Sequence, residues 1–183
     1  NILCIAEKSV VAMRQIEPQL VQEMVKAGCV LLENQQDIQR LVDLTVLPNG
    51  TPNKKFVGKN ASVILDAAHI PYNGDPRLII MRAPKNHPFA VIEMLMPILP
   101  VVTVDSFDEG LDVCLMLEAG LHHTATMHSL NMERLNRMAR KMKTSIFVKN
   151  GPSYAGLGFS GEGTTTFTIA TPTGESTTSA RCF

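Results

Sequence analysis

The chain has no tryptophan and two tyrosines, and its basic and acidic residues are equal in number at 17 each. Nucleic-acid binding depends on a surplus of cations that displaces counterions from the phosphates, and this sequence has no such surplus. The scarcity of large aromatic rings also argues against stacking platforms for single strands. These absences predict a protein that does not bind nucleic acid.

The sequence also lacks a metal-binding or disulfide pattern. Its cysteines, Cys4, Cys29, Cys114 and Cys182, are widely spaced, and none forms a CxxC pair or has histidines at zinc-ligand spacing. We therefore expect no metal site, and a reducing, cytoplasmic compartment.

Long apolar runs are missing as well. The best candidate, VIEMLMPILPVVTV, is too short to cross a bilayer and contains Glu93 and two prolines. The first residues show neither the basic region nor the apolar core of a secretory signal. We expect no membrane partner, and we expect the chain, which begins with Asn, to be a piece of a longer polypeptide.

What is present is an alternation of strand and helix patterns. Strands are predicted at KSVVAMRQI, RLIIMR, ILPVVTV, TATMHS and TSIFVKN from their β-branched and apolar content, whereas AVIEMLMP is ambiguous. Helices are predicted at EPQLVQEMVKAG, NQQDIQRLVDLTV, ASVILDAAHI, FDEGLDVCLMLEAG and NMERLNRMARKM. This alternation predicts an α/β domain with a largely parallel sheet flanked by helices.

Two segments carry finer expectations. The helix at NMERLNRMARKM is amphipathic, and its predicted apolar face consists of Met132, Leu135, Met138, Ala139 and Met142. Gly, Ser and Thr dominate residues 151–179, where we expect ordered loops and a strand at TFTIA. Glycines in this stretch fit neither a P-loop nor a dinucleotide fingerprint, so they indicate unusual backbone angles or close chain approach.

Three groups are candidates for chemistry. Cys4 is either a buried thiol, which is the commoner case, or a nucleophile whose thiolate needs nearby cations or oriented amides. His122 and His123, in GLHHTATMHS, are either polar loop residues or bases that accept a thiol proton near neutral pH. Glu93, set among apolar residues, either points to water or accepts hydrogen bonds from two hydroxyls of a ligand such as a ribose.

Together and in this order, six segments resemble the CoA-acylating aldehyde dehydrogenases, above all the acetaldehyde and propionaldehyde enzymes of bacterial ethanolamine and propanediol breakdown. The segments are NILCIAEKSVV, VGKNA, HPFAVIEMLMPILPVV, GLHHTATMHS, TSIFVKNGPSYAGLG and GEGTTTFTIATPTGE. The resemblance covers the chain from its first residues to its last.

This resemblance implies an architecture. Residues 1–150 would form the α/β catalytic, thioester-forming domain, and residues 151–183 its loop-rich continuation toward an oligomerisation segment. The family's N-terminal nucleotide-binding domain would lie outside this chain. The full-length enzyme would be a homo-oligomer in the cytoplasm or inside a bacterial microcompartment.

The resemblance also implies an activity. Enzymes of this family oxidise a short-chain aldehyde to its acyl-CoA with NAD, and Cys4 matches their nucleophile, which would carry the thiohemiacetal and then the acyl-thioester. Glu93 matches the glutamate that holds the nicotinamide ribose. His122 and His123 mark the acylating branch, and which of them handles protons, if either does, is left open. The alternatives are a hydrolytic aldehyde dehydrogenase and a non-catalytic assembly or binding module. The chain by itself is expected to be inactive, because half of the cofactor site would be missing.

Overall fold

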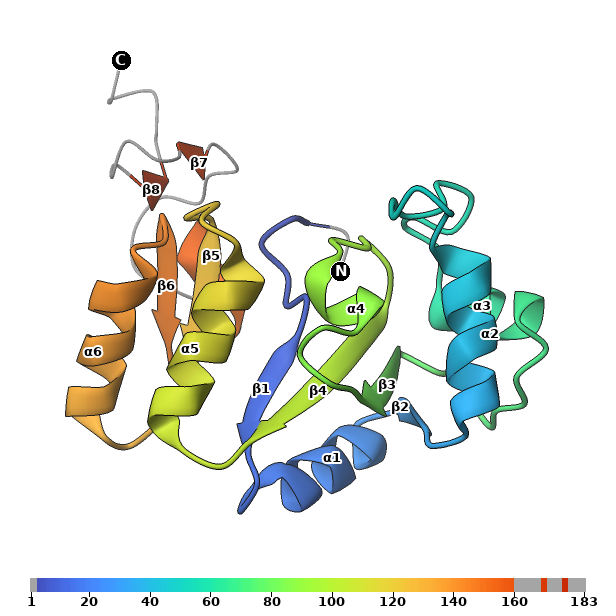
Figure 1. Ribbon diagram of the computed structural model, residues 1–183, viewed down its shortest axis with the longest axis horizontal. Helices are drawn as coiled ribbons and strands as arrows, with labels where there is room; N and C mark the ends of the chain where they lie inside the picture. The colour runs from blue at the N-terminus through green and yellow to red at the C-terminus, as the bar shows by residue number, and fades with distance from the viewer. Residues whose placement is uncertain (1–2, 160–168, 171–175, 178–183) are drawn as a thin grey trace. The chain divides into compact units, whose positions relative to one another are not determined.

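The computed structural model describes residues 3–159, 169–170 and 176–177 (Figure 1). The chain divides into two compact units, Asn1–Gly110 and Leu111–Phe183, and each is described here by itself. The sequence predicts a different division, with one domain to residue 150 and a loop-rich continuation, and that domain assignment stays a prediction. Both units combine parallel strands with helices, so the predicted α/β class is confirmed.

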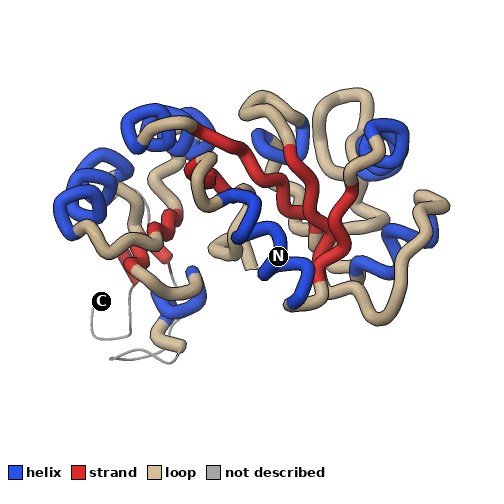
Figure 2. Tube along the Cα trace, turned by 90° about the horizontal axis from the view of Figure 1, so that it is seen from below, coloured by secondary structure: helices blue, strands red, loops and turns tan. Residues whose placement is uncertain are grey.

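The first unit is built on a four-stranded sheet in the order β1-β4-β3-β2, with every neighbouring pair parallel. Figure 2 shows the strands of this sheet in red, side by side. Its strands are β1 (Val10–Met13), β2 (Cys29–Leu32), β3 (Leu78–Arg82) and β4 (Ile98–Val104). The central strand β4 coincides with the predicted ILPVVTV segment. Pro100 is tolerated there because it lies before the first β1–β4 pair, Val10 with Val101, and so does not interrupt that ladder.

Helices cover both faces of this sheet. The connection from β1 to β2 runs across the sheet in one direction and the later connections return, so right-handed crossovers place their helices on opposite faces. On one face Val21 of α1 packs with Ala12, Ile80 and Val101. On the other, a larger core includes residues of α2, α3 and α4. The helices are α1 (Glu17–Lys26), α2 (Gln35–Thr45), α3 (Ala61–Ala67) and α4 (Pro88–Val91).

The second unit pairs β5 with β6 in parallel, Thr124 opposite Ile146. Beyond α5, which starts in the first unit, its elements are β5 (Thr124–Met127), α6 (Met132–Met142), β6 (Ile146–Lys149), the 3₁₀ helix η1 (Ser153–Leu157), β7 (Ile169–Ala170) and β8 (Ser176–Thr177). Helix α5 spans Phe107–Glu118 and is capped by Ser106, whose Oγ accepts a hydrogen bond of 3.1 Å from the Glu109 N–H.

The apolar face of α6 is mostly as predicted, since Leu135, Met138 and Met142 are buried. Met132, however, is 60% exposed, so its assignment to that face is wrong. Side chains in a helix lean toward its N-terminus, and Met132 is the first residue of α6, with no preceding turn to cover.

Two expected strands differ from the structure in length or coverage. The strand predicted at KSVVAMRQI is shorter, because β1 ends at Met13 and Ile16 is 55% exposed. Of the strand predicted at TFTIA, only Ile169 and Ala170 are described, as β7, which pairs antiparallel with β8. The rest of that segment lies outside the described residues.

Candidate active site

Cys4 lies in a turn that leads into β1. The Ala6 N–H donates to the Leu3 carbonyl at 2.8 Å, and the two residues that follow Cys4, Ile5 and Ala6, are buried. The cysteine itself is exposed. The alternative in which Cys4 is a buried structural thiol is therefore wrong, and its sulfur is open to an electrophile.

The other described cysteines have a different environment. Cys29, on β2, is half-buried, and burial raises the pKa of its thiol. Burial raises the pKa of Cys114, on α5, to about 11. Because the thiolate is the reactive form, both are suppressed as nucleophiles near neutral pH. Among the described cysteines, Cys4 is thus the one placed to react.

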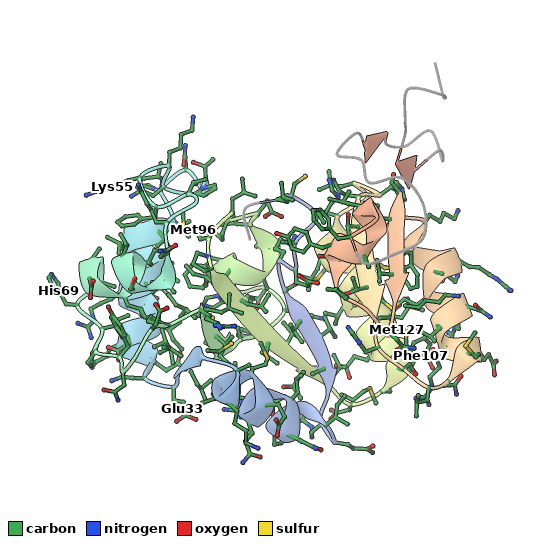
Figure 3. All side chains as sticks on the ribbon, turned by 180° about the vertical axis from the view of Figure 1, so that it is seen from behind. Glu33, Lys55, His69, Met96, Phe107 and Met127 are labelled. Carbon is green, nitrogen blue, oxygen red and sulfur yellow. The ribbon has the colours of Figure 1, made fainter. Side chains whose placement is uncertain are left out.

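Glu93 lies in the irregular segment between α4 and β4, which resolves the ambiguous AVIEMLMP stretch. The glutamate is exposed, whereas Met94 and Met96, the second labelled in Figure 3, are buried on either side of Leu95. Leu95 has a φ of 51°, and its carbonyl accepts a 3.0 Å hydrogen bond from the Gly58 N–H. A left-handed leucine is unusual, so packing and this hydrogen bond hold the Glu93 segment in a strained conformation.

The topology brings Cys4 and Glu93 to one edge of the sheet. Cys4 precedes β1, Glu93 precedes β4, and these two strands are parallel neighbours. Both residues therefore lie at the amino edge. Figure 1 shows the N-terminal segment and α4 at the same end of this unit.

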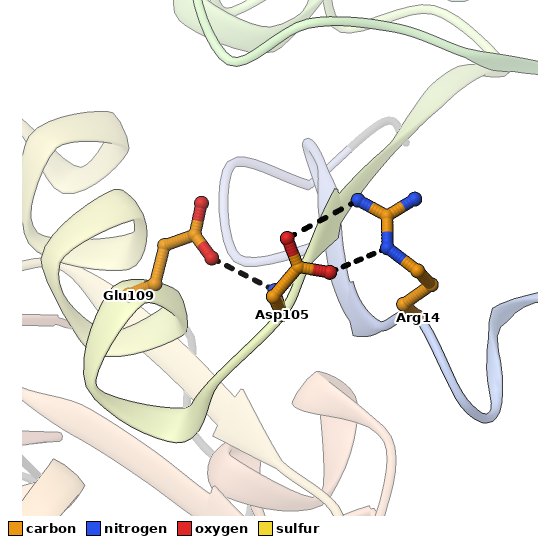
Figure 4. A network of polar contacts seen from close by, with 3 residues as sticks. All are labelled: Arg14, Asp105 and Glu109. Atoms are coloured by element: carbon orange, nitrogen blue, oxygen red, sulfur yellow. Dashed lines mark hydrogen bonds and ion pairs between the residues drawn. The ribbon is translucent and has the colours of Figure 1, made fainter.

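The opposite, carboxyl edge carries paired charges. Arg14, just after β1, forms an ion pair with Asp105, just after β4, and the Glu109 carboxylate accepts a 2.8 Å hydrogen bond from the Asp105 N–H (Figure 4). The hydrogen bond to Arg14 lowers the pKa of the Asp105 carboxyl. This cluster is largely exposed and ties two neighbouring strand ends together.

A second cluster continues along the same edge. Arg82, at the end of β3, contacts the carboxylate of Glu17 at 2.8 Å and that of Glu33, labelled in Figure 3, at 3.4 Å. Glu17 is 6% exposed, and the Arg82 guanidinium is its ion-pair partner. Ligands of open parallel sheets usually bind at the carboxyl edge. Here that edge is spanned by ion pairs, and the candidate residues lie at the other edge.

His122 belongs to the second unit and is held at both its ring and its backbone. Its Nδ1 is 3.3 Å from the carbonyl oxygen of Met142, at the end of α6. A carbonyl can only accept, so this contact places the imidazole proton on Nδ1 and leaves Nε2 as the basic nitrogen. The His122 carbonyl in turn accepts hydrogen bonds from the N–H (2.9 Å) and the hydroxyl (3.2 Å) of Ser145.

His123 is held differently. Its N–H donates to the Glu118 carboxylate at 2.9 Å, and its Nδ1 lies 2.7 Å from the Thr124 hydroxyl. A hydroxyl can donate or accept, so this contact does not fix the tautomer. Both histidines are half-buried. Of the two candidates, His122 is the one with a defined basic nitrogen.

The histidine partners Met142 and Ser145 were not identified from the sequence. Met142 acts through a backbone carbonyl, which has no residue signature.

Within the described segments, no group of three or more His, Cys, Asp or Glu side chains could hold a metal ion. No helix of that part of the chain is long and apolar enough to cross a membrane.

No family model matches the chain. Curated relatives do. The chain is 53% identical over its whole length to a propanal dehydrogenase (CoA-propanoylating) of Citrobacter freundii, and 44% identical to the acetaldehyde dehydrogenase (acetylating) EutE of Salmonella typhimurium. It spans 40% of the length of each of these relatives.

Solved structures of similar proteins share the fold. A Rhodopseudomonas palustris propionaldehyde dehydrogenase with bound propionyl-CoA matches 99% of this chain, and 40% of its own, with a TM-score of 0.95 and 44% identity. An engineered glycolyl-CoA reductase with bound NADP+ matches 100% of this chain and 41% of its own, with a TM-score of 0.95 and 43% identity. A propionaldehyde dehydrogenase from the Clostridium phytofermentans fucose utilisation microcompartment matches 99% of this chain and 41% of its own, with a TM-score of 0.94 and 42% identity.

Further structures of two of these proteins concern single residues. The Rhodopseudomonas palustris enzyme is also known with bound CoA and an acylated cysteine. The Clostridium phytofermentans enzyme is known with one cysteine, and separately one histidine, replaced by alanine.

The fold of this chain is similar to that of part of the solved aldehyde dehydrogenases, with TM-scores of 0.95 and 0.94 to two propionaldehyde dehydrogenases. Over its whole length the chain is a relative of the CoA-acylating aldehyde dehydrogenases, as its sequence motifs predict.

Proposed function

We propose that this chain carries the thioester-forming chemistry of an enzyme that oxidises acetaldehyde or propionaldehyde to the acyl-CoA with NAD. The observation that carries the proposal is the exposed Cys4 at the amino edge of the sheet, which Glu93 shares, in a chain 53% identical to a CoA-propanoylating dehydrogenase. The NAD-binding domain would lie outside residues 1–183, since the chain spans two fifths of its relatives' length.

Cys4 would act as nucleophile. Its thiolate forms a C–S bond with the aldehyde carbonyl, and the resulting alkoxide of the thiohemiacetal is stabilised by backbone N–H donors such as that of Cys4. NAD, when bound, accepts the hydride that leaves as the alkoxide collapses to a thioester. The thiol of CoA then attacks this thioester, the C–S bond to Cys4 breaks, and the Cys4 thiolate is regenerated.

Glu93 fits a nucleoside ligand. It is exposed, its backbone is fixed by buried neighbours, and a carboxylate can accept hydrogen bonds from two vicinal hydroxyls. Its place at the same sheet edge as Cys4 is what a residue that orients a nicotinamide ribose needs. We therefore assign cofactor binding to Glu93 in this proposal.

His122 is the base that we favour over His123. Its Nε2 is the unprotonated nitrogen, so it can take the proton of the CoA thiol. A second point supports the choice. The cysteine and the histidine replaced in the Clostridium phytofermentans enzyme are separated by the same number of residues as Cys4 and His122. His123 remains the alternative that the experiment must separate.

The test uses the complete protein that contains this chain, with propionaldehyde, NAD and CoA as substrates. Cys4→Ala should abolish both NADH and propionyl-CoA formation while the circular dichroism spectrum is unchanged, and Cys29→Ala serves as the matched control with activity retained. Cys4→Ala with near wild-type activity would refute the proposal. A wild-type enzyme that releases free propionate without requiring CoA would be a hydrolytic dehydrogenase, and one without any turnover would be a binding module.

The remaining assignments have separate tests. Glu93→Gln should raise the KM for NAD, and an unchanged KM would remove Glu93 from the site. His122→Gln should slow the CoA-dependent step more than His123→Gln does, and the reverse order would move the base to His123.

We also propose assembly of the complete enzyme as a homo-oligomer, inside a bacterial microcompartment. The support for the location is the fucose-utilisation microcompartment origin of one similar protein, and the homo-oligomer is what the family resemblance implies. Sedimentation of the purified enzyme and co-fractionation with microcompartment shells would test the two parts, and a monomer free in the cytoplasm would contradict both.

A further inference from the structure

The end of α6 and the turn that carries His122 are connected by three contacts. Helix α6 ends at Met142. Its C-cap residue, Lys143, is left-handed with a φ of 51°, and the Lys143 N–H donates to the Ala139 carbonyl at 3.2 Å. Two of the three contacts come from Ser145, whose N–H and hydroxyl both donate to the His122 carbonyl. The third contact joins the His122 ring to the Met142 carbonyl.

The chemistry of a helix end explains why Met142 is suited to this. The last carbonyls of a helix have no intrahelical donor, and they carry the negative end of the helix dipole. Such an oxygen favours an N–H facing it over a ring-nitrogen lone pair. The contact at 3.3 Å therefore selects the tautomer with the proton on Nδ1.

The backbone of His122 shows that the surroundings impose its position. Its φ is 53°, in the left-handed region that residues other than glycine seldom adopt. A residue stays in this region when contacts with its neighbours outweigh the strain of its backbone, and such residues cluster at functional sites. Here the neighbours are the two donors of Ser145 and the acceptor at Met142. A histidine that merely filled a polar loop would not need all three.

We propose that the C-terminal cap of α6, residues 142–145, is the positioning element of the base, and that it holds His122 with Nε2 unprotonated for the CoA thiol. This inference rests on the proposed function. It assigns positioning roles to Met142, through its carbonyl, to Lys143, through its left-handed backbone, and to Ser145, through its two donors. None of these residues needs to touch substrate.

Lys143 offers a matched pair of variants, because its side chain is exposed and makes none of the three contacts. Lys143→Gly removes the side chain and keeps the left-handed cap, which glycine adopts freely. Lys143→Val also removes the side chain, but a β-branched residue resists a positive φ, so the cap and the Met142 carbonyl must shift. The two variants therefore differ in the conformation of the cap.

The measurement is made on the complete protein and separates the two half-reactions. Rapid mixing with aldehyde and NAD alone reports the NADH burst, and mixing of the acyl-enzyme with CoA reports acyl transfer. We expect Lys143→Val to slow acyl transfer about tenfold, the lower end of what losing a hydrogen-bond partner costs at metal-ligating histidines, and to leave the burst unchanged. Lys143→Gly should stay within about twofold of wild type in both steps, because glycine keeps the left-handed cap.

A second variant keeps the inference testable if Lys143→Val does not fold. Ser145→Ala removes the hydroxyl donor and should also slow acyl transfer alone, and Ser145→Thr, which restores a hydroxyl, should recover it. The ¹⁵N spectrum of histidine-labelled protein gives a readout without activity. The His122 signal, identified by its loss in His122→Gln, should report a protonated Nδ1 in wild type and a mixture of tautomers in Lys143→Val.

The measurements distinguish failure of the proposed base from failure of the positioning inference. If His122→Gln leaves acyl transfer at the wild-type rate, the proposed base is wrong. If His122→Gln abolishes acyl transfer while a folded Lys143→Val matches Lys143→Gly in both rate and tautomer, the base stands and the positioning inference is overturned. A loss of the NADH burst in Lys143→Val equal to its loss of acyl transfer would likewise overturn it, because a general structural defect affects both steps.

Discussion

Alkylation of the cysteines in the native protein tests the central feature of the candidate site. The perturbation is iodoacetamide at pH 8, which reacts with thiolates. Of the described thiols, Cys4 is exposed, and burial raises the pKa of Cys29 and raises that of Cys114 to about 11. We expect the modification rates to fall in the order Cys4, Cys29, Cys114.

The magnitude follows from the ionised fractions. At pH 8 an ordinary thiol with a pKa of about 8.5 is ionised in about one molecule in four. A thiol with a pKa of about 11, as for Cys114, is ionised in about one in a thousand. Ionisation alone therefore makes Cys114 about two-hundredfold slower than an ordinary accessible thiol. Restricted access to its half-buried side chain slows it further.

The assay is a time course of quenched samples, digested with trypsin and analysed by mass spectrometry. Trypsin places each of these three cysteines on a peptide of its own. In guanidinium chloride the three rates should converge, which controls for peptide detection, and Cys4→Ser should remove the fast phase. Equal native rates for Cys4 and Cys114, or a Cys4 that resists alkylation, would refute the reasoning from burial.

Three further predictions concern stability, measured as the free energy of unfolding in urea. Gly156→Ala should lower the free energy of unfolding by about 1–3 kcal/mol, because the new Cβ would overlap the Ile146 side chain of β6, whereas the new Cβ of Gly151→Ala meets the Val148 side chain at a distance that a small shift relieves and should cost less. Equal losses in the two variants would contradict this packing. Arg82→Met should destabilise the protein by about 1–3 kcal/mol, because it leaves the buried carboxylate of Glu17 without its ion-pair partner, while Arg14→Met, in an exposed pair, should have no measurable effect. Similar losses in the two variants would show that burial of the pair does not matter. The Nδ1 of His87 accepts the 3.2 Å hydrogen bond that caps α4, and burial lowers the pKa of this histidine, so the unfolded chain binds the proton more tightly and stability should fall as pH drops below about 6.5. His87→Asn, which keeps a cap, should lose this part of the pH dependence, and an unchanged profile would exclude His87 as its source.

Strong periodicity made much of the fold predictable. The predicted ILPVVTV run coincides with β4, and the helices at 17–28 and 34–46 were found within two residues at each end. In each case the local pattern and the tertiary environment agree. By contrast α4 has four residues, too few for a period, and the strained Leu95 follows it, so the sequence around Glu93 gave no clear element.

The candidate residues were predicted from the family resemblance, and the contacts around them were not. Nothing local in the sequence links His122 to Met142, because the link is a backbone carbonyl at the end of a helix. Arg82 and Glu17 are 65 positions apart and meet only when the sheet forms. Met132 fits the helical period but lies at the end of its helix, where a period carries no information about what covers it.

The pairing of β1 with β4 has a consequence for how the protein is made. Val10 lies beside Val101, so the strand that follows Cys4 has no neighbour until the ribosome has delivered β4. Pairing across so long a loop is slow and carries a large closure entropy. During synthesis the turn that carries Cys4 is therefore the last part of this sheet to be fixed. Until then no neighbouring strand of this sheet holds the turn that presents the Cys4 thiol.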